Sequence, residues 1–244
     1  MKRCFCAILI LLLLLPMLIG CNDADEELKR QIAEYRENKI EAYEKENERY
    51  ADDEVEVAFL GDSLTDGYDL SLYYPQYLTC NRGIGGETTV GLEERMQVSL
   101  YDLKPRVAVM LIGANNMDTM LENYERILIG MRENVPSTRV ILLSLTSMGG
   151  EWGRKNQLAA YNNVTIKLLA EKYSFAYVDL YSALLNLESG EICEEYTTDG
   201  GHLTPKGYEV LTAQITPVIE RELALWNEER KNTERAAEEM LGAR

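Results

Sequence analysis

Four runs of nearly continuous apolar residues, at 55–60, 106–112, 140–144 and 175–180, constrain the fold more than any other feature of this 244-residue sequence. Strands that are apolar at almost every position are buried on both faces, which is typical of parallel sheets. Apolar residues at helical spacing separate the runs, as in the stretch 117–135. The alternation predicts a doubly wound α/β sandwich, with its functional site at the carboxyl ends of the strands.

The composition excludes several classes of function. Acidic residues number 41 against 25 lysines and arginines, for a formal net charge of −16. Such a surface repels phosphate backbones, so we expect no sequence-independent binding of nucleic acid. The chain contains a single histidine, His202. Zinc sites built from two or three histidines are therefore excluded, and a histidine-dependent enzyme has one candidate base.

The N-terminus has the form of a secretory signal. A basic start at 1–3 precedes an apolar run at 4–19, which is shorter than the roughly 18 residues or more of a membrane-spanning helix. The run ends in Leu-Ile-Gly-Cys at 18–21, which resembles the lipobox of bacterial lipoproteins. This resemblance implies a signal peptide over 1–20 and a lipid on Cys21 that anchors the exported protein in the cell envelope. A plain signal peptide is the alternative.

A charged segment at 22–54 follows the signal, with 13 acidic and six basic residues and neither proline nor glycine. Leu28, Ile32 and Tyr35 lie at helical spacing, which predicts a weakly amphipathic helix. We interpret 21–54 as the lipidated cysteine and a helical spacer. A partner-binding coiled coil would need three or four heptads, more than the pattern supplies.

No second change of composition occurs within 55–218, so we expect one domain there. The remaining residues, 219–244, are again charged and predict a helical tail. Leu223, Leu225 and Trp226 are the apolar residues with which this tail can pack back on the domain.

The five cysteines do not form a disulfide framework. Cys4 and Cys6 leave with the signal, and Cys21 is the candidate for lipidation. Cys80 and Cys193 remain in the domain, either as two buried thiols or as one disulfide bridge.

Four short motifs, each after a predicted strand or in a terminal loop, carry the polar residues of a candidate site. The motifs are 61–67 (Gly-Asp-Ser-Leu-Thr-Asp-Gly), 81–89 (Asn-Arg-Gly-Ile-Gly-Gly-Glu-Thr-Thr), 113–116 (Gly-Ala-Asn-Asn) and 199–204 (Asp-Gly-Gly-His-Leu-Thr). Together they supply a serine on a tight turn, backbone N–H groups, a side-chain amide, and a histidine three residues after a carboxylate. These are the groups that acyl transfer requires: a nucleophile, a base, an orienting acid and donors for an oxyanion.

The order and text of the four motifs resemble the SGNH hydrolases, also called GDSL esterases and lipases, over roughly residues 55–218. The resemblance is strongest to the small, single-domain branch akin to platelet-activating-factor acetylhydrolase subunits and bacterial acyl esterases. It implies a three-layer α/β/α sandwich around a mostly parallel, flavodoxin-like five-stranded sheet.

The resemblance also implies the roles of the site residues. Ser63 is the expected nucleophile, His202 the base, and Asp199 the acid that orients the histidine. The N–H of Ser63, the N–H of Gly83 and the side chain of Asn115 are the expected donors to the oxyanion. This mechanism requires neither a metal ion nor an organic cofactor.

Two further residues qualify the resemblance. Many members of the family have aspartate where this chain has Asn116, which leaves the function of that position open. Trp152, in the segment 148–153 after a strand end, is a candidate to contact substrate, because an aromatic ring can stack on the face of a sugar. Anchoring of its own loop is the alternative role.

We therefore expect a serine esterase that removes short acyl groups, above all O-acetyl groups, from a small ester or an acetylated carbohydrate. No long apolar insertion between the motifs is available to build a deep lipid tunnel, which favours a short acyl pocket. The alternatives are a lysophospholipase or thioesterase, a sugar O-acyltransferase, and a non-catalytic carbohydrate-binding lipoprotein. The sequence leaves a homo-oligomer open.

Overall fold

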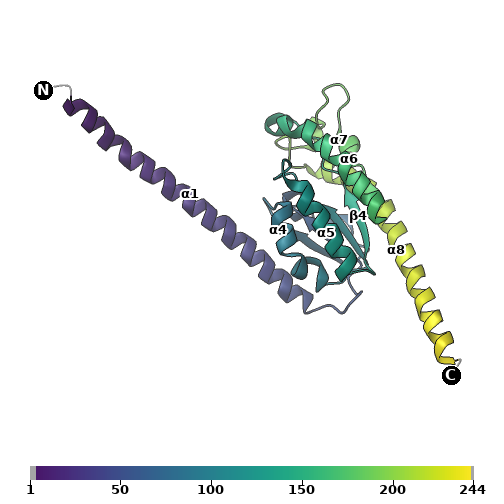
Figure 1. Cartoon of the computed structure of the whole chain (residues 1–244). Helices are drawn as coiled ribbons and strands as arrows, with labels where there is room; N and C mark the ends of the chain where they lie inside the picture. Colours follow the sequence, from purple (N-terminus) through teal and green to yellow (C-terminus); the bar gives the residue numbers. More distant parts are fainter. Residues whose placement is uncertain (1–3, 243–244) are drawn as a thin grey trace. The chain divides into compact units, whose positions relative to one another are not determined.

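The computed structural model describes the backbone of residues 4–242 and the side chains of residues 26–241. The chain divides into two units, Met1–Ala42 and Tyr43–Arg244. Helix α1 (Cys4–Asn47) begins in the first unit and ends in the second (Figure 1).

The first unit contains the predicted spacer helix, as the N-terminal part of α1. Its apolar residues Leu28, Ile32 and Tyr35 are exposed. The side chain of Cys21, where we expect a lipid, lies outside the described residues. Among the described residues, no helix combines the length and apolar character that crossing a membrane requires.

The second unit is built on a five-stranded sheet in the order β2-β1-β3-β4-β5. The strands are β1 (Val57–Gly61), β2 (Thr79–Gly83), β3 (Val107–Leu111), β4 (Arg139–Leu143) and β5 (Ala176–Val178). Every pairing in this sheet is parallel, as the continuous apolar runs predict. The order is that of flavodoxin-like folds, with the switch point between β1 and β3, so the predicted fold is confirmed.

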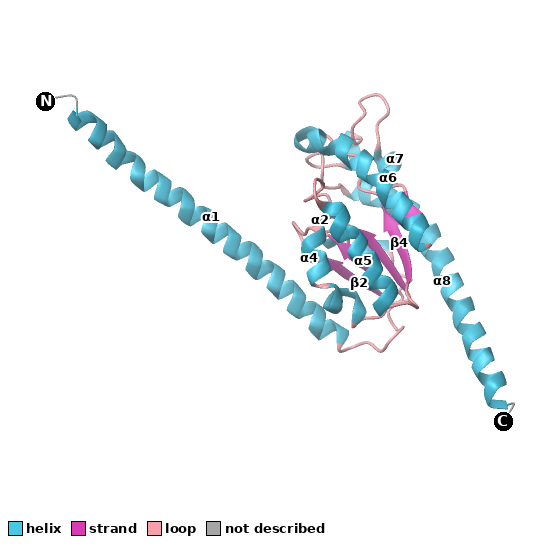
Figure 2. Ribbon diagram, in the orientation of Figure 1, coloured by secondary structure: helices cyan, strands magenta, loops and turns pink. Residues whose placement is uncertain are grey.

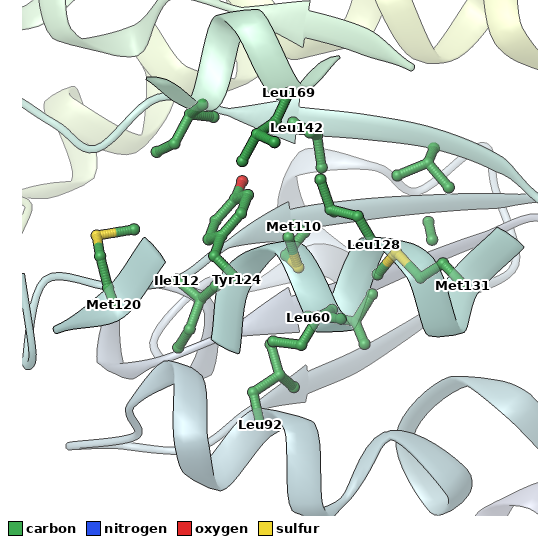
Figure 3. Close-up of a cluster of buried hydrophobic side chains, with 14 of the residues drawn as sticks. Leu60, Leu92, Met110, Ile112, Met120, Tyr124, Leu128, Met131, Leu142 and Leu169 are labelled. Atoms are coloured by element: carbon green, nitrogen blue, oxygen red, sulfur yellow. The ribbon is translucent and has the colours of Figure 1, made fainter. Parts of the chain in front are cut away.

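Helices cover both faces of the sheet and make it the middle of three layers (Figure 2). Alternate strand residues point to opposite faces. Leu60, Met110 and Leu142 pack beneath α4 (Thr89–Glu94), α5 (Met120–Asn134) and α6 (Asn156–Tyr173), in the cluster shown in Figure 3. Their strand neighbours pack in a second core, beneath α3 (Leu70–Tyr73), α7 (Leu180–Leu184) and α8 (Pro205–Gly242).

Short helices complete the unit. They are α2 (Ser63–Asp66), the π-helix η1 (Gln97–Tyr101) and the 3₁₀ helices η2 (Gly150–Lys155) and η3 (Glu194–Tyr196). Of these, α2 and η2 lie at the carboxyl ends of strands and carry candidate site residues.

The second unit begins at Tyr43, earlier than the boundary expected at residue 54. Arg82, on the edge strand β2, has no exposed side-chain surface and pairs with Glu46 of α1. Its guanidinium also donates to Asn47 Oδ1 at 2.9 Å and lies over the ring of Tyr43. Because a buried arginine requires partners, the last turn of α1 is part of the domain rather than of the spacer.

The C-terminal boundary is also displaced, because α8 continues without a break from the domain into the expected tail. Leu223 and Trp226 are buried, as predicted, whereas Leu225 is exposed. The guanidinium groups of Arg106 and Arg230 both lie 5.2 Å from the centre of the Trp226 ring. The helix is therefore held by the domain as far as residue 230, and the residues from 231 to 241 are exposed.

Cys80 and Cys193 are both free thiols and form no bridge, but only Cys80 is buried, whereas Cys193 is half-buried. Burial raises the pKa of the Cys80 thiol to about 11, so it is protonated and unreactive at neutral pH.

Candidate active site

The nucleophile turn connects β1 directly to α2. A Cβ atom at Gly61 would lie 2.2 Å from Thr65 Oγ1 and 2.3 Å from the carbonyl oxygen of Leu111, so only glycine fits. Asp62 caps α2 by accepting a hydrogen bond from the N–H of Leu64 at 3.1 Å. The close packing of this turn fixes Ser63 at the first position of α2, at the switch point of the sheet.

Ser63, His202 and Asp199 form a continuous chain of hydrogen bonds. Ser63 Oγ lies 3.1 Å from His202 Nε2, and His202 Nδ1 lies 2.7 Å from Asp199 Oδ2. These contacts bring together residues that are 139 positions apart in the sequence. The distances suit proton transfer from the serine hydroxyl to an imidazole that the carboxylate orients.

Asp199 also organises its own loop. Its Oδ1 accepts the main-chain N–H groups of Gly201 at 2.9 Å and His202 at 2.7 Å. Burial acts to raise the pKa of Asp199, but these bonds and the one from the imidazole outweigh it and hold the pKa well below its usual value. The carboxylate is therefore ionised throughout the neutral range.

Asp62 is a second carboxyl group near the base, and its side chain is buried. Burial raises the pKa of Asp62 to about 6, against the opposing effects of the bond from Leu64 and the charge of His202. The pKa values of the two aspartates are thus shifted in opposite directions, that of Asp62 upward by burial and that of Asp199 downward by its hydrogen bonds.

The loop of the second motif leaves one main-chain N–H group available to a ligand. Within 83–88, the N–H of Gly86 is the one for which no described residue supplies an acceptor. The other N–H groups, in the order 83, 84, 85, 87 and 88, donate to Asn81 Oδ1, Gly61 O, Asp66 Oδ2, Ile84 O and Glu87 Oε1. Gly86 is exposed and has a φ of 76°, a conformation that favours glycine.

Gly83 does not fit the role that the family resemblance implied. It is the last residue of β2, and its N–H donates to Asn81 Oδ1 at 2.9 Å. A Cβ atom at Gly83 would lie 2.2 Å from the nitrogen of Asp66, so this glycine lets β2 pack against α2. Gly83 thus has a packing role, and Gly86, which sequence analysis did not single out, carries the N–H that is available to a ligand.

The third motif is joined to the second by both of its asparagines. Asn115 Nδ2 donates to Glu87 O at 2.8 Å, which places the amide beside Gly86. Asn116 accepts from the N–H of Thr89 at 3.1 Å and donates to Thr89 Oγ1 at 2.8 Å. Asn116 therefore holds the start of α4, a function that an amide performs as well as a carboxylate.

Trp152, on η2, lies beside the base. Its ring centroid is 5.9 Å from that of His202, and the two rings are perpendicular. A Cβ atom at Gly201 would lie 2.8 Å from three atoms of the indole, so the loop of His202 packs directly on this ring. The structure thus brings Trp152 to the predicted site, in the position of an anchor for the histidine loop.

Comparison with known proteins agrees with this geometry. The model of the GDSL-like lipase/acylhydrolase family matches residues 59–210. A GDSL-like lipase from Bacteroides thetaiotaomicron is 25% identical with a TM-score of 0.67, over 75% of this chain and 97% of that one. An acetylxylan esterase from Geobacillus stearothermophilus is 19% identical with a TM-score of 0.57, over 70% and 95% of the two chains. No curated protein matches the sequence.

The family model covers all four motifs, from β1 to the loop of His202 and into α8. The hydrogen-bonded Ser63, His202 and Asp199 all lie within the matched residues, and the strand order is that of the family's fold. The chain therefore belongs to the GDSL-like lipase/acylhydrolase family, the SGNH hydrolases, and is a carboxylic ester hydrolase.

Proposed function

We propose that the protein hydrolyses short-chain acyl esters, above all O-acetyl esters of carbohydrates, through an acyl-enzyme on Ser63. The observation that carries the proposal is the chain from Ser63 Oγ to His202 Nε2 and from His202 Nδ1 to Asp199 Oδ2, at 3.1 and 2.7 Å. A serine hydroxyl is a weak nucleophile unless a base lies beside it, and this arrangement supplies that base.

In the first step, Ser63 Oγ attacks the ester carbonyl and its proton passes to His202 Nε2. The carbonyl π electrons move to oxygen and form a tetrahedral oxyanion. When the carbonyl re-forms, the bond to the alkoxy oxygen breaks, and His202 protonates the departing alcohol. In the second step His202 takes a proton from water, which attacks the acyl-enzyme, and the acid leaves as Ser63 regains its proton.

Three donors are available for the oxyanion. The N–H groups of Ser63 and Gly86 have no acceptor among the described residues, and the Asn115 amide keeps a second hydrogen after donating to Glu87 O. Removal of one such donor typically lowers kcat by about 10²–10³. We therefore assign the oxyanion to Ser63, Gly86 and Asn115.

The acetyl preference rests on the connections between the motifs. Short helices and loops follow β1 and β2, and a loop leads from β3 into α5, so among the described residues no inserted segment forms a wall for a long acyl chain. An acyl tail without such a wall would remain in water and contribute no binding energy. The name of the Geobacillus stearothermophilus protein states that it is an acetylxylan esterase, and this chain shares its fold.

A panel of p-nitrophenyl esters with acyl chains of about two to twelve carbons, together with acetylated xylo-oligosaccharides, tests the proposal. We expect kcat/KM to be highest for acetyl or butyryl esters and acetate to be released from the sugars. A kcat/KM that increases steadily to the longest chain would instead identify a lipase or lysophospholipase. Transfer of the acetyl group to an added sugar in preference to water would identify an acyltransferase.

We also propose that the enzyme is exported and held at a membrane by lipid on Cys21. The basic start at 1–3, the apolar run at 4–19 and the Leu-Ile-Gly-Cys sequence support this. The wild type should partition into detergent, and Cys21→Ala should release it or block processing of the signal. Mass spectrometry that shows an unmodified N-terminus at another residue would refute the proposal.

A further inference from the structure

A buried arginine beneath the site binds main-chain groups of two catalytic motifs. Arg95 follows α4, and its side chain is 1% exposed. Its Nη2 donates to Gly61 O at 3.1 Å and its Nη1 to Arg82 O at 3.0 Å. These carbonyl groups lie at the ends of β1 and β2, and Gly61 is two residues before the nucleophile.

The counter-charge of Arg95 comes from Glu87, in the loop that carries the oxyanion donors. Glu87 Oε2 accepts from Arg95 Nε at 2.8 Å, and the Glu87 side chain is 5% exposed. The main-chain oxygen of Glu87 accepts the Asn115 amide, and Gly86 directly precedes it. The ion pair therefore contacts the strand end that precedes Ser63, and it includes the residue that follows Gly86 and accepts the Asn115 amide.

The hydrogen bonds of the Arg95 guanidinium are more specific than the filling of a buried space requires. Two apolar side chains of similar volume fill a core at lower cost than a buried ion pair, whose ions must leave water. Arg95 instead directs a fourth hydrogen bond to Ser99 Oγ at 2.7 Å. The planar guanidinium presents its donors in a fixed fork, so it sets the spacing of the groups that it binds.

We propose that Arg95, held by Glu87, is a positioning residue for acyl transfer, which fixes Ser63 relative to the N–H of Gly86 and the amide of Asn115. The inference rests on the proposed function, because it concerns the alignment of the nucleophile with the oxyanion donors. A displacement of about 1 Å at a reacting centre costs about 10²-fold in rate. Arg95 touches no reacting atom, and its effect passes through the main chain.

The variant Arg95→Lys tests this role. Lysine keeps the charge and can pair with Glu87, but a single ammonium group cannot reproduce the fork to Gly61 O and Arg82 O. With p-nitrophenyl acetate, we expect kcat to fall about 10- to 100-fold while KM changes less than about threefold. An alkylboronic acid, which forms a tetrahedral adduct with the serine, should bind more weakly by a similar factor.

Glu222→Gln is the matched control. Glu222 has a side chain that is also 5% exposed and pairs with Arg139 at 2.9 Å. Arg139 is the first residue of β4 and therefore lies at the amino ends of the strands, whereas the site lies at their carboxyl ends. This variant should lower Tm as Arg95→Lys does, yet keep kcat within about twofold of the wild type.

Ser99→Ala is the milder variant if Arg95→Lys does not fold. It removes one acceptor of the guanidinium and should lower kcat about threefold or more, without a matching change in KM. A folded Arg95→Lys, or Ser99→Ala in its place, with wild-type kcat would overturn the inference. An equal loss of kcat in Glu222→Gln would do the same. Activity that persists in Ser63→Ala would overturn the proposed function itself. The variants of Arg95, Ser99 and Glu222 test only the positioning role, so the two failures are distinguishable.

Discussion

The indole of Trp152 meets the imidazole of His202 edge-on, with ring centroids 5.9 Å apart and an interplanar angle of 90°. The ammonium group of Lys155 lies 4.6 Å from the centre of the same indole and donates to Ala114 O at 3.2 Å. The main chain at Gly201 also packs directly against the indole ring. These contacts link the histidine loop to the third motif, and they favour an anchoring role for Trp152 over stacking on a sugar.

Substitution of Trp152 separates the two roles. We expect Trp152→Ala to lower kcat about tenfold on both p-nitrophenyl acetate and an acetylated xylo-oligosaccharide, because the position of the base is disturbed for every substrate. Trp152→Phe, which keeps an aromatic ring, should recover most of the loss. Steady-state kinetics on both substrates measure this. A loss confined to the sugar, expressed in KM, would show that the indole binds carbohydrate instead.

Replacement of the nucleophile should abolish turnover. Ser63→Ala leaves α2 and its Asp62 cap in place, so we expect an unchanged circular dichroism spectrum and a loss of kcat/KM of several orders of magnitude. A fluorophosphonate should label the wild type and not the variant. Ser71→Ala, at an exposed serine that donates to Asp69, is the control and should keep full activity and labelling. Near-normal turnover in Ser63→Ala would eliminate the mechanism.

The acid limb of the pH profile should report on the base and not on Asp199. The pKa of Asp199 lies well below its usual value, so this carboxylate stays ionised across the working range. Because His202 is the only histidine, the acid limb of kcat/KM should share its midpoint with the one imidazole titration seen by NMR. Asp199→Asn should lower kcat about 10³- to 10⁴-fold, as in other triads. Activity that ignores the imidazole titration would exclude His202 as the base.

Asp62 should make stability fall as pH rises. Its folded-state pKa of about 6 exceeds the ordinary value of 3.8, so the folded protein binds the proton more tightly than the unfolded chain does. The shift corresponds to a stability loss on the order of 3 kcal/mol between pH 4 and pH 7. Asp62→Asn retains an acceptor for the cap, and we expect its Tm advantage over the wild type to appear above pH 4 and increase to pH 7.

Asp69→Asn is the control for this experiment, with the opposite sign. Asp69 caps α3, and hydrogen bonds from Ser71 and Leu72 lower its pKa, so its contribution to stability is present at neutral pH and lost in acid. This variant should be less stable than the wild type at pH 7 and equal to it at low pH. A lower Tm for Asp62→Asn at pH 7 would show that the buried carboxylate is stabilising.

The parts of the fold that sequence analysis predicted are those with a local signal. Strands β1, β3 and β4 are buried on both faces, and their apolar runs show it. Strand β2 was not delimited, because it is an edge strand of sequence Thr-Cys-Asn-Arg-Gly with only one residue of apolar character. Asn81 and Arg82, with which the second motif begins, lie within it.

The parts that were missed depend on tertiary contacts. The glycines at 83, 85 and 86 are equivalent in the sequence, and only the acceptors that surround them leave Gly86 with a free N–H. Arg95 looks like a surface residue after a short helix, because nothing local shows that the carbonyls of Gly61 and Arg82 converge on it. Triad residues were easier to identify, since a single histidine leaves no alternative.

The burial of Arg82 against the end of α1 determines where the enzyme can be detached from its N-terminal helix. The residues from 26 to 42 are mostly exposed, and a protease that cuts there leaves Tyr43, Glu46 and Asn47 in place around the guanidinium. A cut between Asn47 and Val55 would allow the residues from 43 to 47 to dissociate. The buried guanidinium of Arg82, in the second motif, would then lose these partners. Proteolytic release of a working esterase from this helix is therefore confined to cleavage before Tyr43.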